Sequence, residues 1–239
     1  LLTGSFTPLL MREYAIAHEQ NNTDRLAFLF SKYLPFFYVI TATIACFLTV
    51  HGDWLAPLIG GDDFSKAALP VMLLGLAPIH QTYGQLSGAL MAATDRTREY
   101  GRISMFMTIL GLPATYFLLA PETYWGLNLG ATGLAIKMVV LQIIGVNIQL
   151  WYNTRQLGLK IRNLLGHQIL VVMLFLVFAT IGKIIVGTSF GIGIGALLAS
   201  GMLYVMFVAT ILFIFPSLIS MSRLELLNHI KTPSAFLKS

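Results

Sequence analysis

Polar side chains stand inside stretches of the sequence that are otherwise apolar. His80, Gln81 and Gln85 occupy one such stretch, and Lys137 and Gln142 occupy another. An amide or an ammonium group in apolar surroundings costs free energy unless it meets water or a polar partner. These five residues are therefore candidates for lining a polar cavity, where they would bind a polar or anionic group.

Motifs for catalysis are not found in the sequence. It has no nucleophilic serine motif, phosphate-binding loop, zinc-protease motif or dinucleotide-binding turn. The five histidines are scattered, and we interpret them as isolated polar or interfacial residues. Asp62 and Asp63 are interpreted as a cap for a helix starting near Phe64 rather than as metal ligands. The single cysteine, Cys46, excludes an intrachain disulfide. We expect no enzyme activity, no metal and no cofactor.

A helical period relates the glutamines to two small residues. Gln81, Gln85, Gly88 and Ala92 follow one another at helical spacing and so share one face of a helix. Small residues permit close helix packing, and glutamine side chains can bond across helices. The face is therefore either a packing surface or the wall of a polar cavity.

Two prolines precede this face in the same apolar stretch. Pro70 and Pro78 cannot donate the backbone hydrogen bonds that would reach the carbonyls of Lys66 and Leu74. A bend results, which serves either as a packing kink or as a hinge. Transporters use broken helices of this kind beside their binding sites.

Lys137 lies about two turns inside its own apolar stretch, counted from Gly130. Its long stem could carry the ammonium to the membrane interface. Alternatively, the ammonium faces the interior of the helix bundle and marks a substrate path. The sequence leaves both interpretations open.

The composition is that of an integral membrane protein. Of the 239 residues 56% are hydrophobic and only 10% are charged, whereas about a quarter of an average globular domain is charged. The formal net charge is +5. Because the basic residues lie in short connections between apolar runs, they indicate membrane topology rather than a nucleic-acid surface.

Six full spans and the end of another are expected, giving an all-α integral membrane fold. A span needs about 20 apolar residues. The chain begins without Met inside an apolar run, so we expect the natural protein to extend further at its N-terminus. A transmembrane region over 1–215 should be followed by a cytoplasmic tail over 216–239. The expected spans are 1–18 (partial), 33–51, 66–93, 103–120, 130–151, 168–187 and 191–215.

The basic residues predict the orientation of these spans. All of the 15 Lys and Arg except Lys66, Lys137 and Lys183 fall on one side of the expected topology. By the positive-inside rule that side, including the C-terminus, is cytoplasmic. The residues on it are Arg12, Arg25, Lys32, Arg96, Arg98, Arg102, Arg155, Lys160, Arg162, Arg223, Lys231 and Lys238.

The order of several short segments resembles a transporter family. The segments are Pro8 to Arg12, Asp24-Arg25, Leu58 to Gly60 with Phe64 and Ala67-Ala68, Gly88 to Ala92 before Asp95-Arg96, and Leu129 to Ala135. Over roughly residues 1–215 the chain resembles the C-terminal half of polysaccharide-type, O-antigen (Wzx-like) flippases. These belong to the multidrug/oligosaccharidyl-lipid/polysaccharide exporter superfamily.

The resemblance implies a fold of fourteen spans in two lobes, of which this chain would be the C-lobe. It implies a transporter in the bacterial cytoplasmic (inner) membrane that flips lipid-linked oligosaccharide by alternating access. The implied partners are the lipid-linked saccharide, membrane lipid and the N-terminal lobe of the same protein, with polysaccharide assembly proteins as further candidates. The alternatives are a multidrug or cation exporter of the same superfamily, or a membrane enzyme or scaffold of polysaccharide assembly.

Overall fold

A computed structural model describes residues 2–191 and 193–220, and within these ranges the chain is helical without a strand. Nine α-helices and three short 3-10 helices (η) follow one another in this part of the chain. They are α1 (Leu2–Glu19), α2 (Thr23–Val50), α3 (Gly52–Gly60), η1 (Asp62–Ala67), α4 (Ala68–Leu74), α5 (Ala77–Ala93), α6 (Thr97–Leu119), η2 (Glu122–Tyr124), α7 (Gly130–Gln156), α8 (Ile161–Phe190), α9 (Ile194–Ile214) and η3 (Pro216–Ile219).

Five of the described helices are long and apolar enough to cross a membrane, namely α2, α6, α7, α8 and α9. Each coincides with an expected span, which confirms the all-helical, multi-pass character predicted from composition. Helix α2 begins ten residues before its expected start at 33, because Asn22 caps it by accepting a hydrogen bond from the backbone N–H of Arg25. The expected polar connection is thus largely the first turns of a helix.

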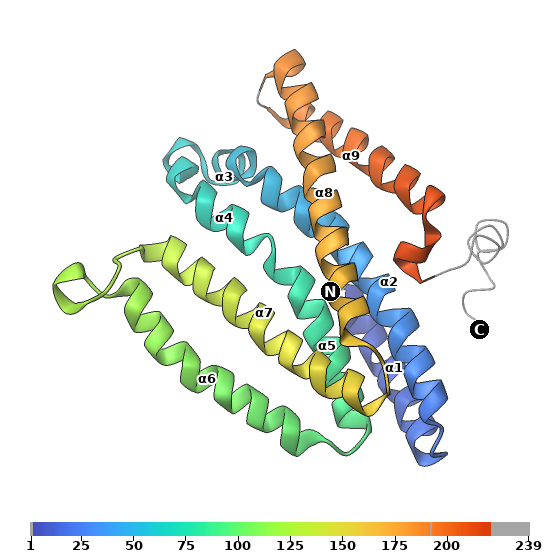
Figure 1. The fold of residues 1–239 in the computed structure, drawn as a ribbon. Coiled ribbons are helices and arrows are strands. Elements are labelled where there is room, and N and C mark those ends of the chain that lie inside the picture. Colours follow the sequence, from blue (N-terminus) through green and yellow to red (C-terminus); the bar gives the residue numbers. More distant parts are fainter. Residues whose placement is uncertain (1, 192, 221–239) are drawn as a thin grey trace.

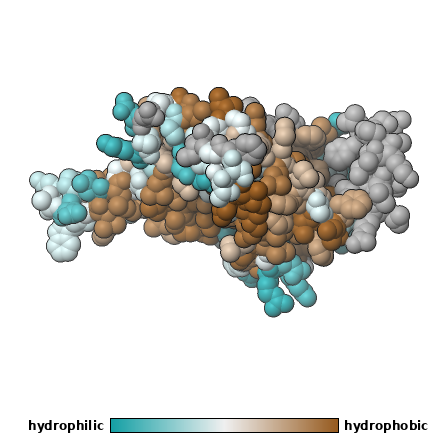
Figure 2. Space-filling model, turned by 90° about the horizontal axis from the view of Figure 1, so that it is seen from above, coloured by the Kyte–Doolittle hydropathy of each residue, from teal (hydrophilic) through white to brown (hydrophobic). Residues whose placement is uncertain are grey.

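Helix α2 lies at the centre of the bundle and carries much of its core. Phe30, Leu34, Tyr38 and Ala42 are fully buried on it. Figure 1 shows α6 and α7 as an antiparallel pair on one side, with α4 and α5 beside α7, and α8 running past α2 before α9 turns back. Seen from above in Figure 2, hydrophobic groups cover much of the outer surface of the helices, as expected for a surface in contact with lipid.

The connections that are expected on one side of the membrane lie at the same end of the helix bundle. At one end, the ring of His18 in the last turn of α1 is 3.8 Å from Asp95, and Arg96 donates to the side chain of Gln156. The ring of His167 near the start of α8 is 2.7 Å from the carbonyl of Leu218 after α9. These contacts gather the connections that carry most of the basic residues at one end of the bundle, as the charge pattern predicts.

The stretch 66–93 is two helices rather than one kinked span. Helix α4 ends at Leu74, a turn follows at Gly75 and Leu76, and α5 starts at Ala77 with Pro78 in its first turn. A proline is tolerated there because first-turn N–H groups have no partner within the helix. Pro70 lies buried inside α4. The break therefore falls just before Pro78, and the proline begins the second helix.

Two smaller expectations differ from the structure. The helix expected to start near Phe64 begins two residues earlier, at Asp62, as η1, and Gly61 rather than an aspartate occupies its N-cap position. The C-terminal tail expected from Pro216 begins with η3, where Pro216, Leu218 and Ile219 are buried. Residues 221–239, which make up most of the predicted tail, lie outside the described residues.

Candidate functional site

Helices α5 and α7 pack side by side and run in the same direction. A Cβ atom on Gly84 would lie 3.1 Å from the side chain of Val146, so the two backbones approach closely there. Further along, one turn on in α5 and two turns on in α7, the side-chain amide of Asn153 donates to the carbonyl of Ser87 at 3.1 Å. Because the two helices run in the same direction, the residues one turn before Gly84 and Val146 also lie at a similar level.

A row of buried and half-buried polar residues follows this interface, and we call it the α5–α7 polar seam (His80, Ser87, Gln142, Gln149 and Asn153). Ser87 and Asn153 are fully buried. Four atoms of the seam have no hydrogen-bond partner among the described residues: His80 Nδ1, Ser87 Oγ, Gln149 Oε1 and Asn153 Oδ1. Buried polar atoms are normally paired. The seam is therefore a place where a polar group can be bound inside the bundle.

The two glutamines singled out in the sequence lie on the outer surface of α5. Gln81, Gln85 and Pro78 are exposed, whereas Ile79, Tyr83 and Leu86 on the opposite face are fully buried. We call Gln81 and Gln85 the Gln stripe. Each of the two glutamines directly follows a residue of the α5 face that contacts α7, so polar groups are exposed on a bundle whose surface is otherwise largely apolar.

Lys137 lies apart from the α5–α7 polar seam and the Gln stripe. Its Cε is 3.7 Å from the position of a Cβ on Gly111, so its stem packs on α6. Viewed along the axis of α7, Lys137 lies on the face opposite Val146. Val146 is the residue that contacts α5 at Gly84. The structure thus brings His80 and Gln142 onto one seam beside the Gln stripe and leaves Lys137 apart from them.

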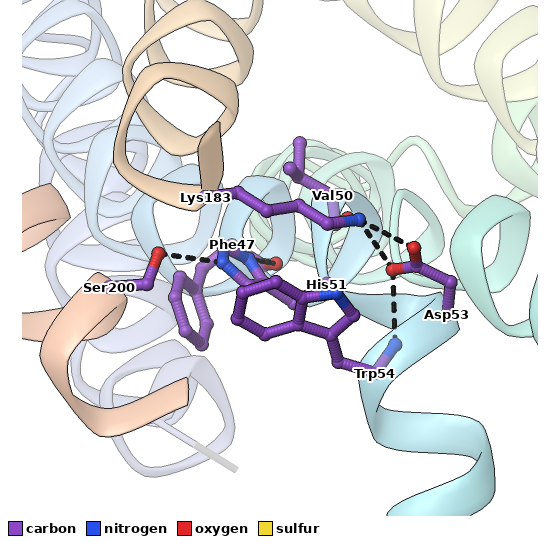
Figure 3. A network of polar contacts seen from close by, with 7 residues as sticks. All are labelled: Phe47, Val50, His51, Asp53, Trp54, Lys183 and Ser200. Carbon is purple, nitrogen blue, oxygen red and sulfur yellow. Dashed lines mark hydrogen bonds and ion pairs between the residues drawn. The ribbon is translucent and has the colours of Figure 1, made fainter. Parts of the chain in front are cut away.

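A second polar cluster joins four helices at the opposite end of the bundle from the basic connections (Figure 3). The ammonium of Lys183 on α8 donates to both carboxylate oxygens of Asp53, at 2.6 and 2.7 Å, and to the carbonyl of Val50 at 2.9 Å. It also lies 5.5 Å from the ring centre of Trp54. All three N–H groups of the ammonium are used, and the contacts hold α8 against the end of α2 and the start of α3.

His51 extends the cluster to α9. Its ring is fully buried, with Nδ1 3.0 Å from the carbonyl of Phe47 and Nε2 2.8 Å from Ser200 Oγ. Because a carbonyl only accepts, Nδ1 carries the proton, and in the neutral ring Nε2 accepts from the serine hydroxyl. Sequence reasoning treated His51 as isolated and left Lys183 inside the expected span 168–187. Their partners are 149 and 130 positions away, and no local pattern reveals such pairs.

No protein-family model, curated protein or solved structure matches this chain. The site is therefore interpreted from its own geometry. Among the described residues no group of three or more His, Cys, Asp and Glu is placed to hold a metal ion. What the arrangement offers is hydrogen bonding by neutral amides and hydroxyls along α5 and α7, and an ion pair that fastens the far end of the bundle.

Proposed function

We propose that this chain forms one lobe of a membrane transporter that flips lipid-linked oligosaccharide across the bacterial cytoplasmic membrane by alternating access. The observation that supports the proposal is the Gln stripe. Two glutamine side chains are exposed beside the α5–α7 polar seam, on the outside of a bundle built for contact with lipid.

A flippase has to carry a polar head group through about 30 Å of hydrocarbon while the lipid tail stays in the bilayer. A glutamine amide both donates and accepts, so it can replace the water that hydrates sugar hydroxyls. The Gln stripe and the seam together supply such groups along α5 and α7. A second lobe packed opposite this face would enclose a polar groove between the two.

The break before Pro78 suits the same mechanism. The turn at Gly75 and Leu76 separates α4 from α5, so α5 can tilt without straining a continuous helix. Lys137 is not part of the proposed groove, because its stem packs on α6. The groove binds its ligand through neutral amides, and in this proposal any charge that meets the substrate's diphosphate comes from other parts of the protein.

The test replaces both glutamines in the full-length protein. Gln81→Leu/Gln85→Leu should slow the flipping of a fluorescent polyprenyl-diphosphate saccharide in reconstituted vesicles by roughly tenfold, since two hydrogen bonds of about 0.5–1.5 kcal/mol each are lost. The rate is measured as loss of protection of the head-group fluorophore from a reductant added outside the vesicles.

The control variant is Thr108→Val. Thr108 is exposed on α6, and its hydroxyl is already bonded to the carbonyl of Ser104 within the helix at 2.9 Å. It should leave the rate unchanged. An unaltered rate in the double glutamine variant, at normal abundance in the membrane, would show that the Gln stripe does not contact substrate.

The proposed orientation places the basic connections in the cytoplasm. In a background with Cys46→Ala, a cysteine at Arg98 should react with a membrane-impermeant maleimide only after the cells are opened. A cysteine at Thr123, in the connection between α6 and α7, should react in intact cells. Both side chains are exposed. The reverse labelling pattern would show that the protein has the opposite orientation in the membrane.

A further inference from the structure

A shallow hollow lies along α7, on a part of its surface that the proposed transport path does not use. It is lined by Ile143, Ile144, Asn147, Ile148, Trp151 and Tyr152. The only polar group in its middle is the amide of Asn147, which donates to the carbonyl of Ile143 at 2.9 Å and accepts from Gln168 on α8 at 3.2 Å. Both ends of that amide are engaged, so the hollow presents an apolar surface.

Three basic residues stand where the hollow reaches the end of α7. The guanidinium of Arg155 lies 5.6 Å from the ring centre of Trp151, which lines the hollow. Lys160 ends the turn to α8, which is tight because the N–H of Leu159 bonds back to the carbonyl of Thr154, and Arg162 lies in the first turn of α8. All three basic side chains are exposed.

Among the described residues, no acidic side chain is paired with these charges. The sequence from Gly130 to Phe190 contains no Asp or Glu. A concentrated positive charge therefore meets the open end of an apolar hollow.

The distance along α7 from the far end of the hollow to Arg155 is close to the length of one lipid acyl chain. Ile143 and Arg155 are twelve positions apart on α7, or roughly 18 Å at about 1.5 Å per residue. Half of a bilayer's hydrocarbon core is about 15 Å thick. An acyl chain lying against the isoleucines would bring its phosphate to the level of Arg155, and Trp151 would lie where interfacial aromatic residues are enriched.

We propose that this hollow binds an anionic phospholipid of the membrane, with an acyl chain against Ile144 and Ile148 and its phosphate at Arg155, Lys160 and Arg162. Basic pockets between membrane helices bind acidic head groups in this way. The site is independent of the transport path and does not rest on the proposed function.

Trp151 is a built-in reporter for the test. The full-length protein, with every other tryptophan including Trp54 and Trp125 replaced by Phe, is reconstituted in phosphatidylcholine vesicles. A small fraction of phosphatidylglycerol brominated on its acyl chains is then included. We expect it to quench Trp151 several-fold more than brominated phosphatidylcholine at the same fraction. Unbrominated phosphatidylglycerol should restore the fluorescence, and inorganic phosphate should not.

The variant Arg155→Gln/Lys160→Gln/Arg162→Gln should abolish the preference, since each basic residue near the head groups contributes up to roughly fivefold. Arg98→Gln/Arg102→Gln, which removes two exposed charges from α6 at the same end, is the matched control and should retain it. Should the triple variant not fold, raising the salt concentration on the parent protein should weaken the preference instead. Equal quenching by the two brominated lipids would overturn the proposal, as would displacement by a polyprenyl phosphate but not by phosphatidylglycerol.

Discussion

Asp53→Asn should destabilise the bundle by about 2 kcal/mol, in the range of hydrogen bonds to charged groups. The substitution removes the charge that balances the Lys183 ammonium and leaves that cation with the carbonyl of Val50 and the face of Trp54. The ammonium side chain is only 20% exposed, so water replaces the carboxylate incompletely. The free energy of unfolding is measured by titrating the purified protein with a denaturing detergent.

A double-mutant cycle isolates the pair. Lys183→Met should also lower the free energy of unfolding. The double variant Asp53→Asn/Lys183→Met should lose less stability than the two single variants added together, since no charge is left unpaired. The matched control is Glu13→Gln. Glu13 pairs with Arg25 at 2.7 Å, and the Arg25 side chain is more exposed than that of Lys183, so its charge is better solvated. Exposed pairs contribute about 0–1 kcal/mol. Additive effects of Asp53→Asn and Lys183→Met would show that the ion pair does not fasten α8 to α2 and α3.

Gly75→Ala should lower the free energy of unfolding by at least as much, about 3 kcal/mol, because the turn between α4 and α5 packs directly against α2. A Cβ on Gly75 would lie 2.6 Å from Thr49 Oγ1 and 2.9 Å from the backbone nitrogen of Thr49. The side chain can rotate away, but the backbone cannot, so the two helices must separate. Loss of stability is read from the same detergent titration.

Gly101→Ala is the control for this substitution. Gly101 also lies in a helix, and nothing stands within 4 Å of the position its Cβ would take. There the exchange should stabilise by up to about 1 kcal/mol through helix propensity. Gly75→Ala/Thr49→Ala should recover only part of the loss, since the clash with the backbone nitrogen persists. Equal effects at Gly75 and Gly101 would show that α2 does not contact the turn.

The polar seam changes how the intramembrane polar residues are interpreted. His80 and Gln142 come from separate apolar stretches, and no local pattern indicates that they lie close together. The parallel packing of α5 and α7, fixed by the small residue Gly84, places them at one level. Ser87, Gln149 and Asn153 join them, although none stood out in the sequence analysis as a site residue. Helical spacing alone identified the Gln stripe, since a face is a local property of one helix.

The sequence by itself predicted the all-helical, multi-pass character of this protein and the gathering of its basic connections at one end of the bundle. These follow from local quantities, namely the length of apolar runs and the placement of Lys and Arg. Only the tertiary structure decided which polar residues meet. Lys137 packs on α6, whereas Lys183 finds Asp53 and His51 finds Ser200 across the bundle. The physical reason is that a buried charge or amide is stabilised by whichever partner the helix packing brings within hydrogen-bonding distance, and that packing depends on contacts between residues far apart in the chain.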